Sequence, residues 1–180
     1  MVYLLLGTGF EEMEAVVPTD LMRRAGIDVL TVGIGGKTVS GSHGIGVTAD
    51  ITVEEMDLTD MEMLVVPGGL GGVASIRGCE KALTALRFAY ENGKYIGAIC
   101  AGPTVLADLG ITDGKKVTCF PGCEKDMGSA LCVPDAAAIQ DGKIITGTSA
   151  GCAVKFGLAL IAALKGQACA QAVADKTVIR

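Results

Sequence analysis

Short apolar runs alternate along the chain with longer segments in which apolar residues recur at helical spacing. Each run is about the length of one strand, and three of them, Val2–Leu6, Met63–Val66 and Tyr95–Ile99, are almost entirely apolar, which is typical of strands buried on both faces. Several runs end at glycine or proline, which favour a turn. The predicted strands are Val2–Leu6, Ile27–Gly33, Met63–Val66, Tyr95–Ile99, Lys116–Cys119, Ala136–Gln140 and Lys143–Thr146.

Helical spacing separates most of these strands. Glycine closes the longest of the helical segments, and Thr38-Val39 with Gly46–Thr48 predicts a small hairpin. Strands that alternate with helices favour an α/β fold, with a mostly parallel sheet covered on both faces. The length and the lack of a linker predict a single domain over residues 1–180. The predicted helices are Glu12–Ala25, Glu80–Asn92, Thr104–Leu109 and Gly151–Leu164.

Composition and charge exclude several classes of protein. Half of the residues are hydrophobic and 19% are charged, which excludes a disordered chain. The formal net charge is −5 and no basic stripe is visible, so no nucleic-acid partner is expected. No apolar run is long enough to span a membrane, and Met1–Leu6 has the pattern of a first strand and lacks a basic leader. We therefore expect a cytoplasmic protein without a membrane partner.

The cysteines do not form the pattern of a disulfide framework. Their number is odd and their spacing irregular, which indicates reduced thiols. Cys119 and Cys123 resemble half of a zinc site, but no second pair follows at a suitable distance. We expect neither a metal nor a cofactor. The seven cysteines are Cys79, Cys100, Cys119, Cys123, Cys132, Cys152 and Cys169.

Three loops follow predicted strands at the edge of the sheet where α/β proteins bind ligands: Gly7–Glu14, Pro67–Gly72 and Cys100–Pro103. Cys100 lies between a buried strand and a helix, so its backbone must turn sharply, as in a nucleophile elbow, and we expect a strained backbone conformation there. A helix amino terminus favours a thiolate, which predicts a reactive sulfur with a lowered pKa. The alternative is an inert cysteine of the core.

Two further groups complete the candidate site. The amides of Gly69 and Ala101 are suited to an oxyanion hole, although paired glycines also form ordinary tight turns. Glu14 lies one turn into a predicted helix, and a buried carboxyl group beside a thiolate would hold a proton. The sequence alone does not bring Glu14 and Cys100 together.

These motifs carry a family resemblance. The segments Gly9–Glu14, Met22–Gly26, Val66–Gly69 and Ala98–Pro103 resemble the ThiJ/PfpI superfamily, and within it the parkinsonism-associated protein deglycase branch. The resemblance covers about Val2 to Leu164. It implies a flavodoxin-like three-layer sandwich, of the class I glutamine amidotransferase type, that forms homodimers.

The resemblance also assigns roles to individual residues. It implies that Cys100 is the nucleophile, that Glu14 is the pocket carboxyl group, and that Gly69 and Ala101 supply the oxyanion amides. Phe120 takes the place of a pocket histidine found in many relatives and is expected at the pocket rim. Thr148 and Ala150 replace an arginine and a proline. His43, the only histidine, is expected on the surface near the pocket rim and the dimer contact.

Three functions are consistent with these residues. The first is a slow enzyme of the glutathione-independent glyoxalase or protein deglycase type, which acts on 2-oxoaldehydes or glycated groups through Cys100 and Glu14. The second is a redox sensor or redox-regulated chaperone in which Cys100 is oxidised. The third, a cysteine peptidase or amidase, requires His43 as a base and is the weakest.

Overall fold

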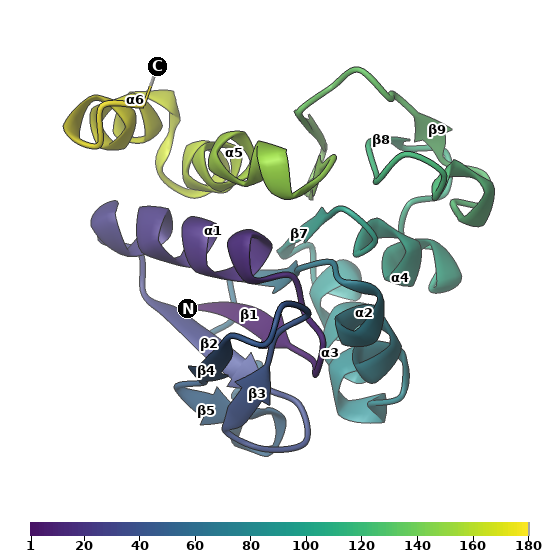
Figure 1. Cartoon of the computed structure of the whole chain (residues 1–180). Coiled ribbons are helices and arrows are strands. Elements are labelled where there is room, and N and C mark those ends of the chain that lie inside the picture. The colour runs from purple at the N-terminus through teal and green to yellow at the C-terminus, as the bar shows by residue number, and fades with distance from the viewer. Residues whose placement is uncertain (180) are drawn as a thin grey trace.

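A seven-stranded sheet forms the centre of the computed structural model, which describes residues 1–179 (Figure 1). Every neighbouring pair in this sheet is parallel except β10 and β11, which form a hairpin. The spatial order is β10-β11-β7-β6-β1-β2-β5. These strands are β1 (Val2–Leu6), β2 (Val29–Gly33), β5 (Ile51–Thr52), β6 (Met63–Val66), β7 (Tyr95–Ile99), β10 (Ala138–Asp141) and β11 (Ile144–Gly147).

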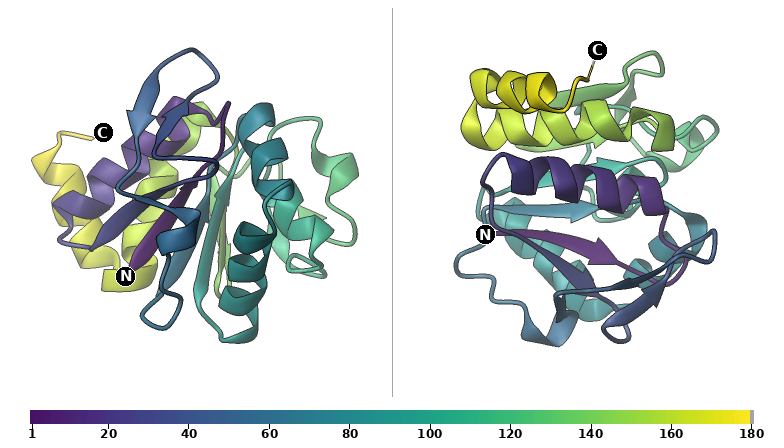
Figure 2. Two further views of the ribbon diagram at one scale, coloured as in Figure 1. Left: turned by 90° about the horizontal axis from the view of Figure 1, so that it is seen from below. Right: turned by 60° about the vertical axis from the view of Figure 1, so that its left-hand side comes forward.

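Helices cover both faces of the sheet, so the predicted three-layer α/β sandwich is confirmed (Figure 2). Along β1, Val2, Leu4 and Leu6 pack into one core while Tyr3 and Leu5 pack into the other. Burial on both faces explains why the central strands are continuous apolar runs. The first face carries α1 (Glu12–Arg24), α5 (Ala153–Lys165) and α6 (Gln167–Lys176), and the second carries α2 (Leu70–Arg77), α3 (Glu80–Glu91) and α4 (Pro103–Asp108).

Smaller elements extend from the sandwich. The predicted hairpin is present as β3 (Thr38–Ser40) and β4 (Gly46–Thr48), and β8 (Lys116–Val117) pairs in parallel with β9 (Leu131–Cys132). Three single turns of 3-10 helix complete the fold. They are η1 (Val53–Glu55), η2 (Glu124–Asp126) and η3 (Ala150–Cys152).

Several predicted strand and helix boundaries were wrong by a few residues. The strand predicted from Ile27 begins at Val29, because the Ile27 amide donates to the Met22 carbonyl and closes α1 (3.0 Å). The strand predicted over Lys116–Cys119 ends at Val117, because the Thr118 amide donates instead to a threonine hydroxyl of β11 (2.9 Å). A local hydrogen bond at the end of α1 sets the first of these ends, and a tertiary hydrogen bond sets the second.

Two helices were not predicted. One is α6, and the other is α2, whose residues overlap the predicted loop Pro67–Gly72. Gly71 and Gly72 lower the helix propensity of this segment. Packing explains Gly72, since a Cβ atom there would lie 2.7 Å from the Cα atom of Phe10.

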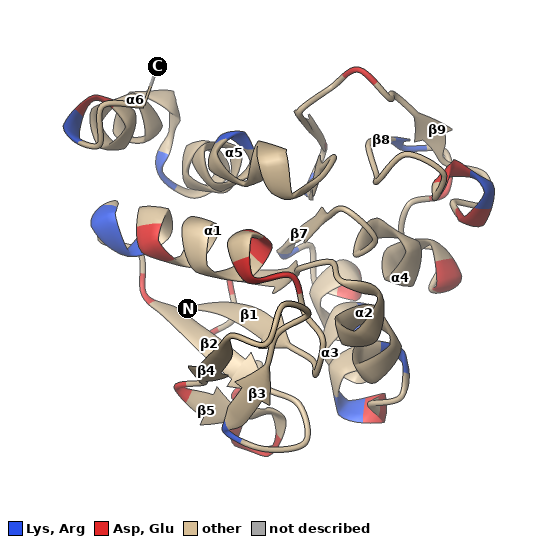
Figure 3. Ribbon diagram, viewed as in Figure 1, with Lys and Arg blue, Asp and Glu red and all other residues tan. Residues whose placement is uncertain are grey.

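Charged residues of both signs are interspersed over the helices and loops seen in Figure 3, without a continuous basic face in that view. Over residues 1–179, every helix is too short or too polar to cross a bilayer.

The crossing of α1 and α5 provides a test of the packing. A Cβ atom on Gly157 would lie 2.9 Å from Leu21 Cδ1 and 3.1 Å from Pro18 Cα. We expect Gly157→Val to lower the free energy of unfolding by about 1–3 kcal/mol through overpacking, measured by urea denaturation. Gly46→Ala is the control, because no atom lies within 4 Å of its Cβ position. Equal midpoints for the two variants would contradict this account of the helix crossing.

Candidate active site

Cys100 lies at the junction of β7 and α4 in a left-handed backbone conformation, with φ of 65°. A non-glycine residue rarely adopts this conformation, so the predicted strain at the elbow is confirmed. The Cys100 amide donates to the Gly147 carbonyl at the end of β11 (2.9 Å). A Cβ atom on Gly102 would lie only 2.5 Å from the Val66 carbonyl oxygen, so the turn closes only with glycine there.

The amides of Gly69 and Ala101 both interact with the Cys100 sulfur and favour its charged form. Among the described residues, neither amide donates to a backbone carbonyl, so both are free to face the pocket. Gly69 has a φ of 82°, and a Cβ atom there would lie 2.3 Å from the Gly9 carbonyl oxygen. The structure therefore brings together the sulfur and both amides predicted from the sequence.

Glu14 is fully buried and reaches the same point from the first turn of α1. Its Oε2 accepts a hydrogen bond from the Gly68 amide (2.7 Å), while Oε1 makes no hydrogen bond of standard geometry with any described residue. A Cβ atom on Gly68 would lie 2.6 Å from Oε2 of Glu14 and 2.7 Å from Cys100 Cβ. Gly68 therefore allows the carboxyl group and the cysteine side chain to approach each other closely.

Each of these two groups shifts the pKa of the other. Burial raises the pKa of Glu14 from 4.5 to about 7, and hydrogen bonds from Cys100 and Gly68 oppose the rise. Burial also raises the pKa of the Cys100 thiol, and the neighbouring Glu14 carboxylate raises it further. Because both charges are disfavoured side by side, the pair holds one proton between them well above neutral pH.

The expectation that the helix amino terminus would lower the pKa of Cys100 was therefore wrong. Helix α4 has only six residues, and its effect is outweighed by burial and by the charge of Glu14. A thiolate at Cys100 is favoured only when Glu14 carries the proton. The two residues form a coupled acid and nucleophile.

Cys100 and Glu14 open onto a pocket of about 420 Å³. Phe120 lines it as predicted for the rim, and its amide donates to the Cys100 carbonyl (2.9 Å). Leu70 lies in the candidate loop Pro67–Gly72, whereas Cys123 and Ser149–Gly151 were not expected to line the pocket. Of these two, only Ser149–Gly151 had a usable signal, since this segment follows the carboxyl end of β11. The lining residues are Glu11, Glu14, Gly69, Leu70, Cys100, Ala101, Phe120, Cys123, Ser149, Ala150 and Gly151.

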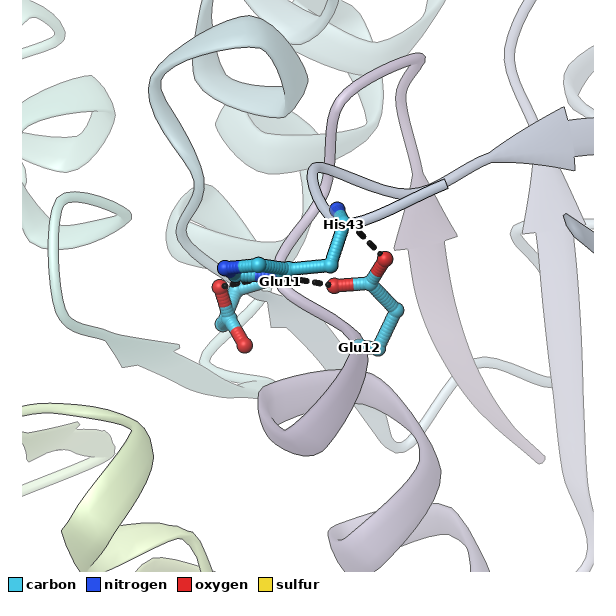
Figure 4. Close-up of side chains that lie close together, drawn as sticks. All are labelled: Glu11, Glu12 and His43. Carbon is cyan, nitrogen blue, oxygen red and sulfur yellow. Dashed lines mark hydrogen bonds and ion pairs between the residues drawn. The ribbon is translucent and has the colours of Figure 1, made fainter. Parts of the chain in front are cut away.

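His43 forms a polar cluster with Glu11 and Glu12, and Glu11 also lines the pocket (Figure 4). Its Nδ1 lies 3.0 Å from Glu12 Oε2 and 3.5 Å from Glu11 Oε2, and its amide donates to Glu12 Oε1 (2.8 Å). The ring is 70% exposed, as expected for a surface histidine, and it is not among the residues that line the pocket with Cys100. A peptidase mechanism therefore lacks its histidine base.

The charges of this cluster stabilise one another. Burial would raise the pKa of Glu12, but hydrogen bonds from the ring and backbone of His43 outweigh it and lower the pKa to about 2. The hydrogen bond to Glu12, with the charges of Glu11 and Glu12, raises the pKa of His43. Ligand atoms of the three residues lie within 4.8 Å of one another, and the ion pair accounts for this proximity. The cluster fastens the β3–β4 loop to the start of α1.

The fold and the site define a class of protein. The chain is a flavodoxin-like α/β sandwich with a cysteine on a nucleophile elbow and a buried carboxyl group beside it. The sequence model of the DJ-1/PfpI family matches residues 1–163. The chain belongs to the DJ-1/PfpI family, which confirms the resemblance seen in the sequence.

Individual relatives agree with this assignment. Protein dj-1beta of Drosophila melanogaster is 34% identical over 173 residues, which cover 95% of this chain and 92% of that protein. Deglycase PH1704 of Pyrococcus horikoshii is 31% identical over 146 residues, which cover 81% of this chain and 87% of that protein. The crystal structure of Drosophila melanogaster DJ-1beta aligns with a TM-score of 0.94 at 32% identity, covering 99% of this chain and 97% of that one.

The raised pKa of Glu14 predicts how stability changes with pH. Between 4.5 and about 7 the folded state binds more protons than the unfolded state, so stability falls as the pH rises through this window. Glu14→Gln keeps an acceptor for the Gly68 amide but cannot ionise. At pH 8 we expect this variant to be more stable than the native protein by as much as about 3 kcal/mol.

Urea denaturation at pH 5 and pH 8 checks this expectation. The gain from Glu14→Gln should shrink toward zero at the lower pH, where the native carboxyl group is protonated in the folded state. Glu91→Gln is the control, since Glu91 is exposed. A gain that is the same at both pH values would mean that ionisation of Glu14 does not cause it.

Proposed function

We propose that the protein is a cysteine-dependent stress-response enzyme that converts reactive 2-oxoaldehydes, free or attached as glycated groups, to hydroxy acids. The observation that carries the proposal is that buried Glu14 lies beside Cys100 and shifts its pKa. The backbone amides of Gly69 and Ala101, which donate to no backbone carbonyl among the described residues, face the same sulfur. Two similar proteins are named deglycases, which supports action on glycated groups. The reaction needs a nucleophile and a proton carrier, and this pair supplies both.

The first step forms a hemithioacetal. The Cys100 sulfur bonds to the aldehyde carbon, the carbonyl electrons move to oxygen, and the thiol proton passes through Glu14 to that oxygen. The amides of Gly69 and Ala101 stabilise the developing negative charge on oxygen. Because Glu14 is buried and its pKa is about 7, it can give and take this proton at neutral pH.

The second step moves a proton between adjacent carbons. Glu14 removes the hydrogen as a proton from the carbon bonded to sulfur and returns a proton to the neighbouring carbonyl carbon. The hydroxyl proton of the hemithioacetal moves to the neighbouring oxygen, which gives the thioester of a 2-hydroxy acid. Water then hydrolyses the thioester and restores the Cys100 thiol. The net reaction adds one water to the 2-oxoaldehyde and requires no oxidant or reductant.

A redox sensor or redox-regulated chaperone is the second candidate function. Oxygen atoms added to the Cys100 sulfur would lie among the Gly69 and Ala101 amides and a protonated Glu14, all of which are donors. These contacts favour a sulfinate over the free thiol. Turnover of a 2-oxoaldehyde distinguishes the two functions.

The catalytic proposal predicts distinct effects at the two residues. Cys100→Ser should abolish conversion of methylglyoxal to the hydroxy acid in the absence of glutathione, because a serine hydroxyl has no base strong enough to ionise it. Glu14→Gln should lower turnover by about 10²–10⁴-fold while leaving hemithioacetal formation detectable. Product is measured by enzymatic or NMR assay. His43→Ala is the control, and a large loss on that change would instead favour a cysteine–histidine mechanism.

Oxidation offers a separate test. With mild peroxide we expect Cys100 to reach the sulfinic acid before the other six cysteines, because two amides and a carboxylic acid beside it stabilise the oxidised product. Peptide mass spectrometry over a time course gives the order. Earlier oxidation of Cys123 or Cys132 would contradict the expected order. Selective oxidation of Cys100 without aldehyde turnover would favour the sensor function.

The protein is also expected to form a homodimer. Met13 and Val16 on α1 and Ile45 in the β3–β4 loop are large, apolar and exposed, as residues of an interface are. Light scattering at micromolar concentration should give the mass of two chains, and Val16→Lys should raise the monomer fraction. A monomer mass for the native chain would refute this expectation.

A further inference from the structure

The lining of the pocket is acidic, and His43, which lies 3.5 Å from Glu11, is outside that lining. Glu11 and Glu14 both line it, and none of the described lining residues is Lys, Arg or His. The guanidinium group of Arg77 donates to Asp108 and to Thr104. A carboxylate or phosphate brought into this pocket would lose water and gain no ion pair, which is costly.

Two large apolar side chains are exposed where they line the same pocket. Leu70 is 81% exposed and Phe120 is 46% exposed. Neither belongs to a buried core, so packing does not explain why apolar groups occupy these positions. Exposed apolar groups that meet at a concave site are typical of a binding surface.

The backbone of Phe120 is hydrogen-bonded directly to Cys100 at the elbow. Its amide donates to the Cys100 carbonyl and its carbonyl accepts from the Cys123 amide, both at 2.9 Å. These two hydrogen bonds fix the position of the Phe120 backbone, and therefore the base of its side chain, relative to the Cys100 sulfur. An anchor that is already ordered loses little entropy when a ligand binds.

We propose that this pocket selects uncharged carbonyl compounds with an aromatic or bulky apolar substituent, and that Phe120 is the residue that determines this specificity. Phe120 and Leu70 hold the substituent while the carbonyl carbon bonds to Cys100. Substrates that carry a carboxylate are rejected because Glu11 and Glu14 repel them. The inference rests on the proposed function for the identity of the reacting carbonyl group.

The test compares three carbonyl compounds. Phenylglyoxal carries an aromatic group, methylglyoxal a methyl group, and glyoxylate a carboxylate. For each one we would measure the affinity of the reversible hemithioacetal at Cys100 by intact-protein mass spectrometry and the rate of product formation. Each affinity is divided by that for a small free thiol, which removes the intrinsic reactivity of the aldehyde. Cys100→Ser corrects for adducts formed at arginines.

We expect the native protein to favour phenylglyoxal over methylglyoxal, and Phe120→Ala to reduce that preference by about 2- to 10-fold, the range of an aromatic contact. Phe120→Arg should improve the relative affinity for glyoxylate. Leu131→Ala is the matched control, because Leu131 is exposed but does not line the pocket. Thermal melting checks that the variants fold.

The outcomes separate this inference from the proposed function. Selective adducts without hydroxy acid would support the specificity of the pocket and refute the catalytic function. Turnover with the same normalised preference in the native protein and in Phe120→Ala would refute the role of Phe120. Binding of glyoxylate as tight as that of methylglyoxal would overturn the exclusion of anions.

Discussion

The left-handed backbone at Cys100 is the constraint on which the site depends. A non-glycine residue held in this region costs on the order of 1–3 kcal/mol, so the surrounding structure must impose it. The end of β11 does so through the hydrogen bond from Cys100 to Gly147, and the Val66 carbonyl allows only glycine at Gly102. Three adjacent strands therefore contribute to one turn. The sulfur is exposed to the pocket because the sheet holds the turn in place.

The same arrangement lowers the free energy of unfolding at neutral pH. Glu14 is enclosed by α1, Gly68 and the elbow, and its charge is disfavoured there. A buried carboxyl group with a pKa near 7 reduces stability wherever it is ionised, yet this pKa suits proton transfer. The sandwich around it, with apolar cores on both faces of the sheet, is large enough to bear that cost.

Burial on both faces made the centre of the fold predictable from the sequence. Three central strands were predicted with the same first and last residues as in the structure, because an apolar run is easily recognised between glycines and polar turns. They are Val2–Leu6, Met63–Val66 and Tyr95–Ile99. Helix α2 was missed because the glycines that lower its propensity are required by close tertiary packing. Cys100 and Glu14 were found from motifs and chain topology.

The rest of the site depends on distances that no local pattern contains. Cys123 reaches the pocket because its amide closes a turn onto the Phe120 carbonyl. The predicted direction of the pKa shift at Cys100 was wrong for a related reason. A helix terminus is visible in the sequence, whereas the burial of the thiol and its closeness to Glu14 are tertiary properties.

The positions that match the deglycase branch and those that depart from it lie in different parts of the pocket. The positions that match the deglycase branch surround the sulfur, where the covalent chemistry would occur. They are Cys100, Glu14 and Gly69. Phe120 and Ala150 depart, and they line the same cavity around these residues. Substitution of Cys100 or Glu14 would alter the proton that the two residues share. Substitution of Phe120 or Ala150 would alter only the surface that contacts the bound molecule. Under the proposed function, the chain therefore keeps the groups needed for chemistry at Cys100 while presenting a different surface to the rest of the bound molecule.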